Sequence, residues 1–238
     1  MPESSDSLIE IEAAVGSLKT VEFALPMSDV EMQITMPEDF ERLLDAAAGD
    51  PEQNLPYWAE IWPSGIALAD EIIAHPEIVR GKQVIEIGSG LGVTASAALR
   101  SGADLTVADY SPESLLLCRH NCLSNSDREP RTLTLNWRVP SARFRELVGP
   151  GFPAVLAADV LYEKRDVEPM LDLIEWLVEP GGLFWLAEPG RNVAERFNER
   201  ATERGWTDAM TFHAGPWPDP RDFNVAVTVH QMRRIAES

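Results

Sequence analysis

The chain has 238 residues, of which 45% are apolar and 25% are charged, and this composition suits one domain with a hydrophobic core and an N-terminal extension. No apolar run approaches the roughly 18 residues that span a bilayer, so we expect no membrane association. The formal net charge of −19 makes nucleic acid an unexpected partner, because an acidic surface repels phosphates.

Much of this charge lies near the N-terminus. Residues 1–60 hold 14 acidic residues against two basic ones, Lys19 and Arg42, which gives this segment a net charge of −12. Two interpretations stay open. The acids form a solvated, solubilising surface, or they form an acidic rim that recruits a basic partner.

The two cysteines, Cys118 and Cys122, lie four residues apart on a predicted helix, where a disulfide is uncommon. His120 lies between them but faces another side of that helix, so the sequence predicts reduced thiols and no metal site. Reduced thiols indicate a cytoplasmic protein, and the acidic, serine-rich start of the chain does not resemble a secretory signal.

The N-terminal extension, residues 1–54, is expected to be separate from a main domain at residues 55–238. Residues 1–18 are predicted to be loosely structured. The segments Thr20–Leu25 and Val30–Met36 alternate apolar and polar residues around a Pro-Met-Ser-Asp turn, which predicts a β-hairpin. Pro37 then introduces a helix over Glu38–Ala48.

An aromatic loop is predicted at residues 55–65, because two prolines flank three aromatic residues there. Tyr57 and Trp58 are expected in the wall of an active site. Two interpretations stay open for Trp62: its ring seals the edge of the hydrophobic core, or it contacts the cofactor. A helix over Ile66–Ala74 follows.

From residue 82 onwards, strands alternate with helices. This pattern predicts a Rossmann-like, doubly wound α/β fold with a mostly parallel seven-stranded sheet and one antiparallel edge strand. The expected strands are Lys82–Ile87, Asp104–Ala108, Thr132–Leu135, Ala154–Ala158, Gly182–Ala187, Gly205–His213 and Asn224–Gln231.

The ends of the first five of these strands carry glycine, polar or aromatic residues. They are Gly88, Asp109, Asn136 with Trp137, Asp159 and Glu188. In doubly wound sheets, ligands bind at the carboxyl ends of the strands. The sequence therefore predicts a single site across that edge of the sheet.

A glycine-rich loop of the form E-x-G-x-G-x-G follows the first strand, with Glu86, Gly88, Gly90 and Gly92 at its fixed positions. Glycines let the backbone approach a ligand, and the next helix offers free N–H groups. The third glycine comes one residue earlier than in the dinucleotide fingerprint. Asp109, at the end of the second strand, suits a ribose diol.

Four motifs occur in order: P-Y-W-A-x-x-W-P-x-G, the glycine loop, A-D-V-L-Y from Ala158 to Tyr162, and E-P-G-R from Glu188. Together they resemble the class I S-adenosylmethionine (SAM) methyltransferases. Within these, residues 55–200 are similar to the seven-β-strand protein-lysine methyltransferases with a D-x-x-Y motif. The most similar group methylates the electron-transfer-flavoprotein β subunit. Ser64 and Glu188 depart from that group, which often has glycine and aspartate there.

The resemblance implies roles for individual residues. The implied cofactor-binding residues are Trp62, Glu86, Gly88, Ser89, Gly90, Gly92, Asp109, Tyr110, Asn136, Trp137, Ala158 and Asp159, and the implied catalytic residues are Asp159, Tyr162 and Trp58. Structural alternatives stay open: Trp137 as a core residue, Tyr162 as the start of a helix, and Asp159 as a helix N-cap.

The sequence thus predicts a SAM-dependent N-methyltransferase, with S-adenosylhomocysteine as product, that acts on a protein lysine. The alternatives are a small-molecule N- or O-methyltransferase, with a small amine as partner, and a SAM-binding module without catalysis. The donor is already activated, so we expect no metal. We also expect a monomer.

Overall fold

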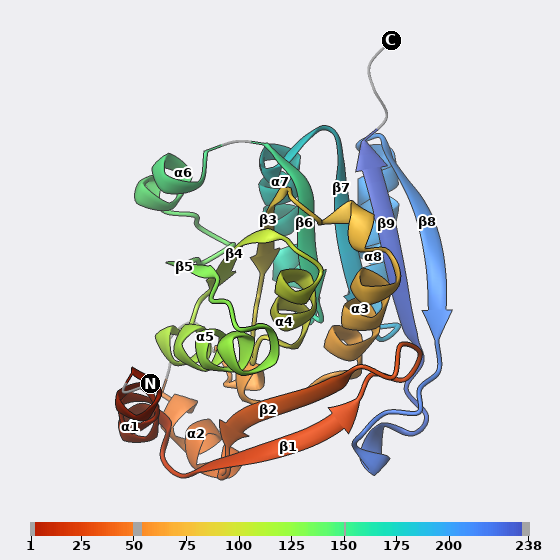
Figure 1. The fold of residues 1–238 in the computed structure, drawn as a ribbon. Helices are drawn as coiled ribbons and strands as arrows, with labels where there is room; N and C mark the ends of the chain where they lie inside the picture. Colours follow the sequence, from red (N-terminus) through yellow and green to blue (C-terminus); the bar gives the residue numbers. More distant parts are fainter. Residues whose placement is uncertain (1–2, 50–53, 150, 235–238) are drawn as a thin grey trace.

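A seven-stranded sheet organises the protein, whose computed structural model describes residues 3–49, 54–149 and 151–234. The strand order is β5-β4-β3-β6-β7-β9-β8 (Figure 1). The strands are β3 (Gln83–Ile87), β4 (Asp104–Asp109), β5 (Arg131–Thr134), β6 (Phe152–Ala158), β7 (Val178–Glu188), β8 (Trp206–His213) and β9 (Val227–Arg234).

The sheet confirms the predicted fold class. Strands β3 to β7 pair in parallel, and β9 pairs antiparallel with both β7 and β8. The antiparallel strand therefore lies one place inside the edge, and β8 forms the edge itself. Within this sheet, the chain first forms the central β3 and then runs outward through β4 to β5. It next crosses to β6, on the other side of β3. This reversal creates the switch point at which such sheets bind ligands.

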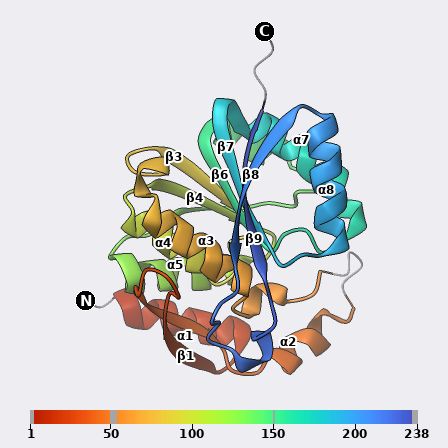
Figure 2. The same ribbon diagram turned by 90° about the vertical axis from the view of Figure 1, so that its right-hand side faces the viewer.

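Helices cover both faces of the sheet (Figure 2). One face carries α3 (Pro63–Ala74), α4 (Val93–Arg100) and α5 (Pro112–Ser126), and the other carries α7 (Val167–Leu177) and α8 (Asn192–Glu203). Successive side chains of a strand point to opposite faces. Val84 accordingly packs with the α3 to α5 layer, whereas Ile85 and Ile87 pack with the α7 and α8 layer. Because both faces are covered, the central strands read as nearly continuous apolar runs.

The N-terminal extension packs against the first helical layer (Figure 1). It comprises α1 (Glu3–Val15), β1 (Leu18–Ala24), β2 (Glu31–Pro37) and α2 (Phe40–Ala47), and it confirms the predicted hairpin. Two asparagines of α5 bind the backbone of β2: Asn121 bonds the N–H and C=O of Thr35, and Asn125 those of Gln33. Asn121 also donates to the Leu91 carbonyl in the glycine loop, 2.9 Å away. The domain boundary at residue 54 stays a prediction.

One sequence-based expectation about local structure is wrong. Residues 1–18, expected to be loosely structured, contain the helix α1, whose Ile11 and Val15 are only 1% and 2% exposed. Their spacing of four residues places them on one helical face, which packs against α5. A short helix, α6 (Ala142–Val148), was also not predicted; the Ser141 hydroxyl caps it by accepting from the Phe144 N–H. In the described ranges, no helix is both long and apolar enough to cross a bilayer.

Candidate active site

The glycine loop connects β3 to α4 through a left-handed backbone. Gly88, Gly90 and Gly92 have φ values of 71°, 49° and 83°, which favour glycine. Two of them also have no room for a side chain. A Cβ at Gly88 would lie 2.7 Å from Val160 Cγ1, and one at Gly92 would lie 2.8 Å from the Cys118 sulfur. The loop therefore packs closely against α5 and against the segment that follows β6.

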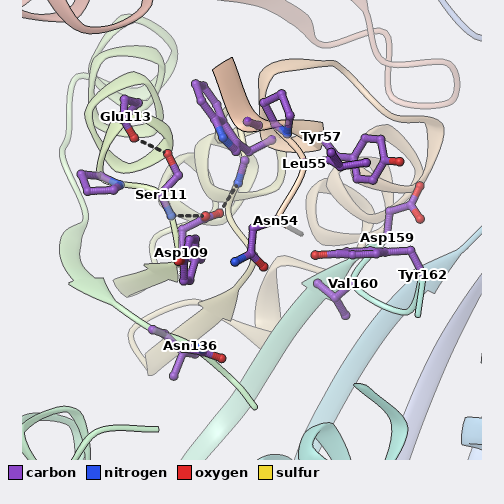
Figure 3. Close-up of a pocket in the computed structure, with 18 of the residues that line it drawn as sticks. Asn54, Leu55, Tyr57, Asp109, Ser111, Glu113, Asn136, Asp159, Val160 and Tyr162 are labelled. Atoms are coloured by element: carbon purple, nitrogen blue, oxygen red, sulfur yellow. Dashed lines mark hydrogen bonds between the residues drawn. The ribbon is translucent and has the colours of Figure 1, made fainter. Parts of the chain in front are cut away.

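Asp109 connects this loop to the start of α5 (Figure 3). Its Oδ2 accepts from the Gly90 N–H at 3.0 Å, and its Oδ1 accepts from the Ser111 N–H at 3.1 Å. The side chain is buried, and burial raises the pKa of Asp109 although these backbone N–H groups lower it. The Ser114 side chain and the Tyr110 backbone also lower the pKa of Asp109, which lines a cavity beside the glycine loop.

A cavity of about 380 Å³ opens between the glycine loop, the aromatic loop and the ends of β4 and β6. Among the predicted site residues, its lining includes Trp58, Trp62, Gly88, Gly90, Asp109, Tyr110, Asn136, Trp137, Ala158, Asp159 and Tyr162. The sequence thus brought together residues from five separate segments. Figure 3 shows Asp109 and Ser111 on one side of the cavity, with Tyr57, Asp159 and Tyr162 on the other.

Three residues predicted to bind the cofactor, Glu86, Ser89 and Gly92, do not line this cavity. Glu86 is 1% exposed beneath the loop, and burial raises its pKa well above the usual value. Within the described residues, Glu86 Oε2 and Ser89 Oγ have no hydrogen-bond partner. Gly92 is instead the packing point between α4 and α5. The cofactor roles of these residues stay predictions.

Four aromatic rings form a continuous wall. The centroid of Tyr57 lies 6.2 Å from that of Trp62 and 5.8 Å from that of Tyr162, and Tyr162 lies 6.2 Å from Trp137. All three contacts are edge-to-face, the geometry that aromatic quadrupoles favour. The Trp62 indole N–H donates to the Tyr57 carbonyl at 2.8 Å, which fixes the fold of the aromatic loop.

A second cavity of about 500 Å³ adjoins the first. It is lined by Leu55, Tyr57, Trp62, Asp159, Tyr162, Glu163 and Arg191, the first five of which also line the inner cavity. Trp58, implied as catalytic together with Asp159 and Tyr162, lines the inner cavity with both of them but does not line the second cavity. The ring that meets Tyr162 is that of Tyr57, because the 3₁₀ turn at Tyr57–Ala59 places neighbouring side chains on different sides. A catalytic role for Trp58 stays a prediction.

Asp159 occupies the junction of the two cavities in a left-handed conformation, with φ of 54°. Its Oδ1 accepts from Arg191 Nε at 3.1 Å and forms an ion pair with Arg191 Nη2 at 3.0 Å. The Asp159 side chain is 8% exposed and the Arg191 side chain 42%. Burial raises the pKa of Asp159, and Arg191 opposes this shift.

The segment that carries Tyr162 is anchored by Asp166, whose side chain is fully buried. Asp166 Oδ1 accepts from Arg138 Nε at 2.6 Å and from the Trp137 indole N–H at 3.2 Å. Burial, together with the Asp166 carboxylate, raises the pKa of the Tyr162 phenol. Tyr162 therefore stays a neutral hydrogen-bond donor at physiological pH.

Behind Asp159, Glu188 Oε2 accepts from the N–H groups of Gly190 and Arg191, at 2.7 and 3.2 Å. Its Oε1 faces His230 Nε2 at 3.4 Å, and His230 Nδ1 faces Asp208 Oδ2 at 2.6 Å. Burial alone lowers the pKa of His230, but the hydrogen bonds to Asp208 and Glu188 outweigh it and raise the pKa to about 9. His230 is therefore an imidazolium at neutral pH.

This shift predicts a pH-dependent stability. A group whose pKa rises on folding stabilises the protein below its unfolded pKa, and the contribution is lost as pH rises through its folded pKa. For His230 the window is pH 6.5 to 9. The expected loss is on the order of 2 kcal/mol after allowance for screening. Denaturation of the wild type and of His230→Gln at both pH values measures it, and equal pH slopes in the two proteins would contradict the assignment.

Several lining residues were missed by sequence reasoning. The N-terminal extension contributes Ala14, Leu43, Ala46, Ala47 and Asn54 to the inner cavity, and other segments add Ser111, Glu113, Arg138 and Arg191. Arg191 belongs to the E-P-G-R segment that the sequence singled out, but no role was predicted for it. No pattern in residues 1–54 pointed to the cavity, because their position depends on packing against α5.

The sheet, the glycine loop and the acid at the end of β4 define a class I methyltransferase. The cavity fits SAM, since it offers a close-packed backbone turn, a carboxyl group that lines the cavity and aromatic walls. A family profile described as lysine methyltransferase matches residues 53–203. The chain therefore belongs to the lysine methyltransferase family, which confirms the resemblance found in the sequence.

Curated relatives support this assignment. The chain is 34% identical to the rat (Rattus norvegicus) electron transfer flavoprotein beta subunit lysine methyltransferase, over 57% of this chain and 51% of that protein. It is 29% identical to the histone-arginine methyltransferase METTL23 of Xenopus laevis, over 56% of this chain and 57% of that protein. The matches thus span little more than half the length of these relatives.

Solved structures share the fold. The SAM-bound magnesium protoporphyrin IX methyltransferase of Synechocystis PCC 6803 has a TM-score of 0.54 at 12% identity, covering 82% of this chain and 97% of that one. The ribosomal protein L11 methylase of Lactobacillus delbrueckii subsp. bulgaricus has a TM-score of 0.53 at 16% identity, covering 70% and 77%.

Proposed function

We propose that the protein is a SAM-dependent methyltransferase that methylates a lysine side chain of a protein substrate. One observation carries the proposal: Asp159 and Tyr162, the fixed positions of the D-x-x-Y motif, line both cavities. The inner cavity, with the glycine loop, holds the cofactor, and the outer cavity admits the acceptor. The two therefore meet at the motif.

When bound, SAM supplies a methyl group already activated by its sulfonium. The protein's residues position the two reactants and exclude water. Gly88 and Gly90 hold the methionine part, Asp109 the ribose hydroxyls, and Trp137 flanks the adenine. A lysine has a solution pKa of about 10.4 and must react as the neutral amine. The aromatic wall of Tyr57, Trp62 and Tyr162 favours that form by desolvation.

Asp159 accepts a hydrogen bond from the amine and takes up its proton through water. The rings of Tyr57 and Tyr162 stabilise the methylammonium product by cation–π contact, worth about 0.5–2 kcal/mol. The small-molecule alternative is not favoured, because the names of both curated relatives give protein substrates. We also propose that the enzyme is a cytoplasmic monomer that acts without a metal.

The substrate class is tested by incubating the purified protein with methyl-labelled SAM and a cell lysate. Mass spectrometry after proteolysis then locates the labelled residue. We expect methyl-lysine, and roughly 100-fold slower labelling with Asp159→Asn. Label confined to small amines or to arginine would contradict the proposal, and arginine is a meaningful outcome because one relative is named an arginine methyltransferase.

The cofactor role of Asp109 is tested with Asp109→Asn. This change removes the charge but keeps an oxygen that can accept from the Gly90 or Ser111 N–H. We expect SAM to bind more weakly by on the order of 1–3 kcal/mol, because charged hydrogen bonds are lost. Calorimetry with SAM measures this, and Asp104→Asn at the exposed start of β4 is the control. Unchanged affinity for Asp109→Asn would refute the assigned role.

A further inference from the structure

A bare carboxylate beside the acceptor would oppose methyl transfer. An amine next to an isolated anion is stabilised as the ammonium, which has no lone pair to react. In this structure Asp159 does not stand alone, since the Arg191 guanidinium contacts its Oδ1 through two nitrogens. The pair has no net charge, yet Asp159 keeps lone pairs that can accept from an amine.

Arg191 needs support to hold this position, because its side chain is 42% exposed and long side chains lose entropy when fixed. The support comes from the turn before α8. Glu188 Oε2 accepts from the N–H groups of Gly190 and Arg191, which fixes the backbone at the point where the Arg191 side chain leaves it. The proline between Glu188 and Gly190 restricts the same turn.

His230 in turn fixes Glu188. The imidazole is 2% exposed, and each of its ring nitrogens faces a carboxylate oxygen, one of Glu188 and one of Asp208. With both nitrogens donating, the ring balances the buried Glu188 and the partly exposed Asp208 and holds Glu188 in one orientation. This also explains why the E-P-G-R segment has glutamate: its side chain reaches both the turn and β9, which lies beside β7.

We propose that Arg191 neutralises and orients Asp159 for the acceptor amine, and that Asp208, His230 and Glu188 are positioning residues that hold Arg191 in place. These contacts are present in the structure, whereas their role in binding an acceptor amine rests on the proposed function. Among the described residues, Arg191 lowers the pKa of Asp159, whereas the charges of Glu188 and Asp222 raise it, so Arg191 opposes two neighbouring acids.

The experiment follows the titration of Asp159 in the full-length protein by NMR of carboxyl-labelled aspartate, with Asp159→Asn for assignment. Arg191→Met should raise its titration midpoint by about one pH unit or more, because a neighbouring cation is lost. Arg191→Lys should restore part of the shift. An unchanged midpoint in Arg191→Met would overturn the proposal.

The positioning part is tested with His230→Gln and a matched control, His213→Gln. His213 is also buried and paired with a carboxylate, Glu71 Oε1 at 2.9 Å, but it does not line either cavity. His230→Gln should raise the Asp159 midpoint, and His213→Gln should not. If His230→Gln does not fold, Asp208→Asn removes the outer carboxylate at a 21% exposed site. Equal midpoints in these variants and the control would refute the positioning role.

Methyl incorporation into lysate protein from labelled SAM, measured from pH 6 to 9, adds a functional readout. Arg191→Met should shift the rise in rate to higher pH, because the unpaired carboxylate favours the ammonium, while SAM affinity stays unchanged. An unshifted profile would overturn the role toward the amine. If the wild type labels no protein at all, the proposed function fails, and the NMR result still decides whether Arg191 controls Asp159.

Discussion

Replacing Gly92 with alanine is expected to destabilise the protein by about 3 kcal/mol or more, since backbone strain and overpacking both contribute. Gly92 has φ of 83°, which L-residues disfavour. A Cβ there would lie 2.8 Å from the Cys118 sulfur and 3.0 Å from the Cys118 Cα. The backbone of α5 cannot yield as a flexible side chain would, so α4 and α5 would move apart. Chemical denaturation measures the loss.

Gly81→Ala is the matched control. Gly81 also has a left-handed backbone, with φ of 70°, but a Cβ there would meet no atom within 4 Å. Only the conformational cost of about 1–2 kcal/mol applies. The excess loss in Gly92→Ala thus measures the contact between α4 and α5. Equal losses in the two variants would show that this contact leaves room for a methyl group, and would contradict the packing argument.

The sequence predicted the sheet and the part of the inner cavity formed by the strand ends, because both depend on local patterns. Buried parallel strands are apolar on both faces, so β3, β4 and β6 are visible as short apolar runs. Ligand sites in such sheets lie at the carboxyl ends of strands. Asp109 and Asp159 therefore had to lie at the same edge, although 50 residues separate them in the chain.

The features that the sequence did not predict depend on contacts between distant segments. Helix α1 begins with a polar, serine-rich stretch, and Ile11 and Val15 are buried where it packs against α5. The pairing of Arg191 with Asp159 joins residues 32 positions apart and requires the turn that Glu188 fixes. Tyr57, and not Trp58, contacts the Tyr162 ring because of the 3₁₀ turn at Tyr57–Ala59. The prolines and aromatic residues of this loop do not reveal such a turn in the sequence.

The D-x-x-Y motif yields the largest expected effect on activity. Asp159→Asn is expected to lower the turnover number by roughly 100-fold, because the amide cannot take up the proton of the amine. Tyr162→Phe is expected to lower it by roughly tenfold, the effect of one lost hydrogen bond. Both changes preserve shape, and asparagine tolerates the left-handed backbone at position 159. SAM affinity should change by less than about twofold, because the motif acts on the acceptor.

Two quantities are measured for each variant. One is the initial rate of methyl transfer to the acceptor that the lysate experiment identifies, and the other is SAM affinity by calorimetry. Asp127→Asn is the control, since Asp127 is also an aspartate with a left-handed backbone, at the end of α5, and lines neither cavity. It should leave both quantities unchanged. If Asp159→Asn or Tyr162→Phe weakens SAM binding as much as it lowers turnover, the motif serves the cofactor, and the acceptor amine must approach from another side of the inner cavity.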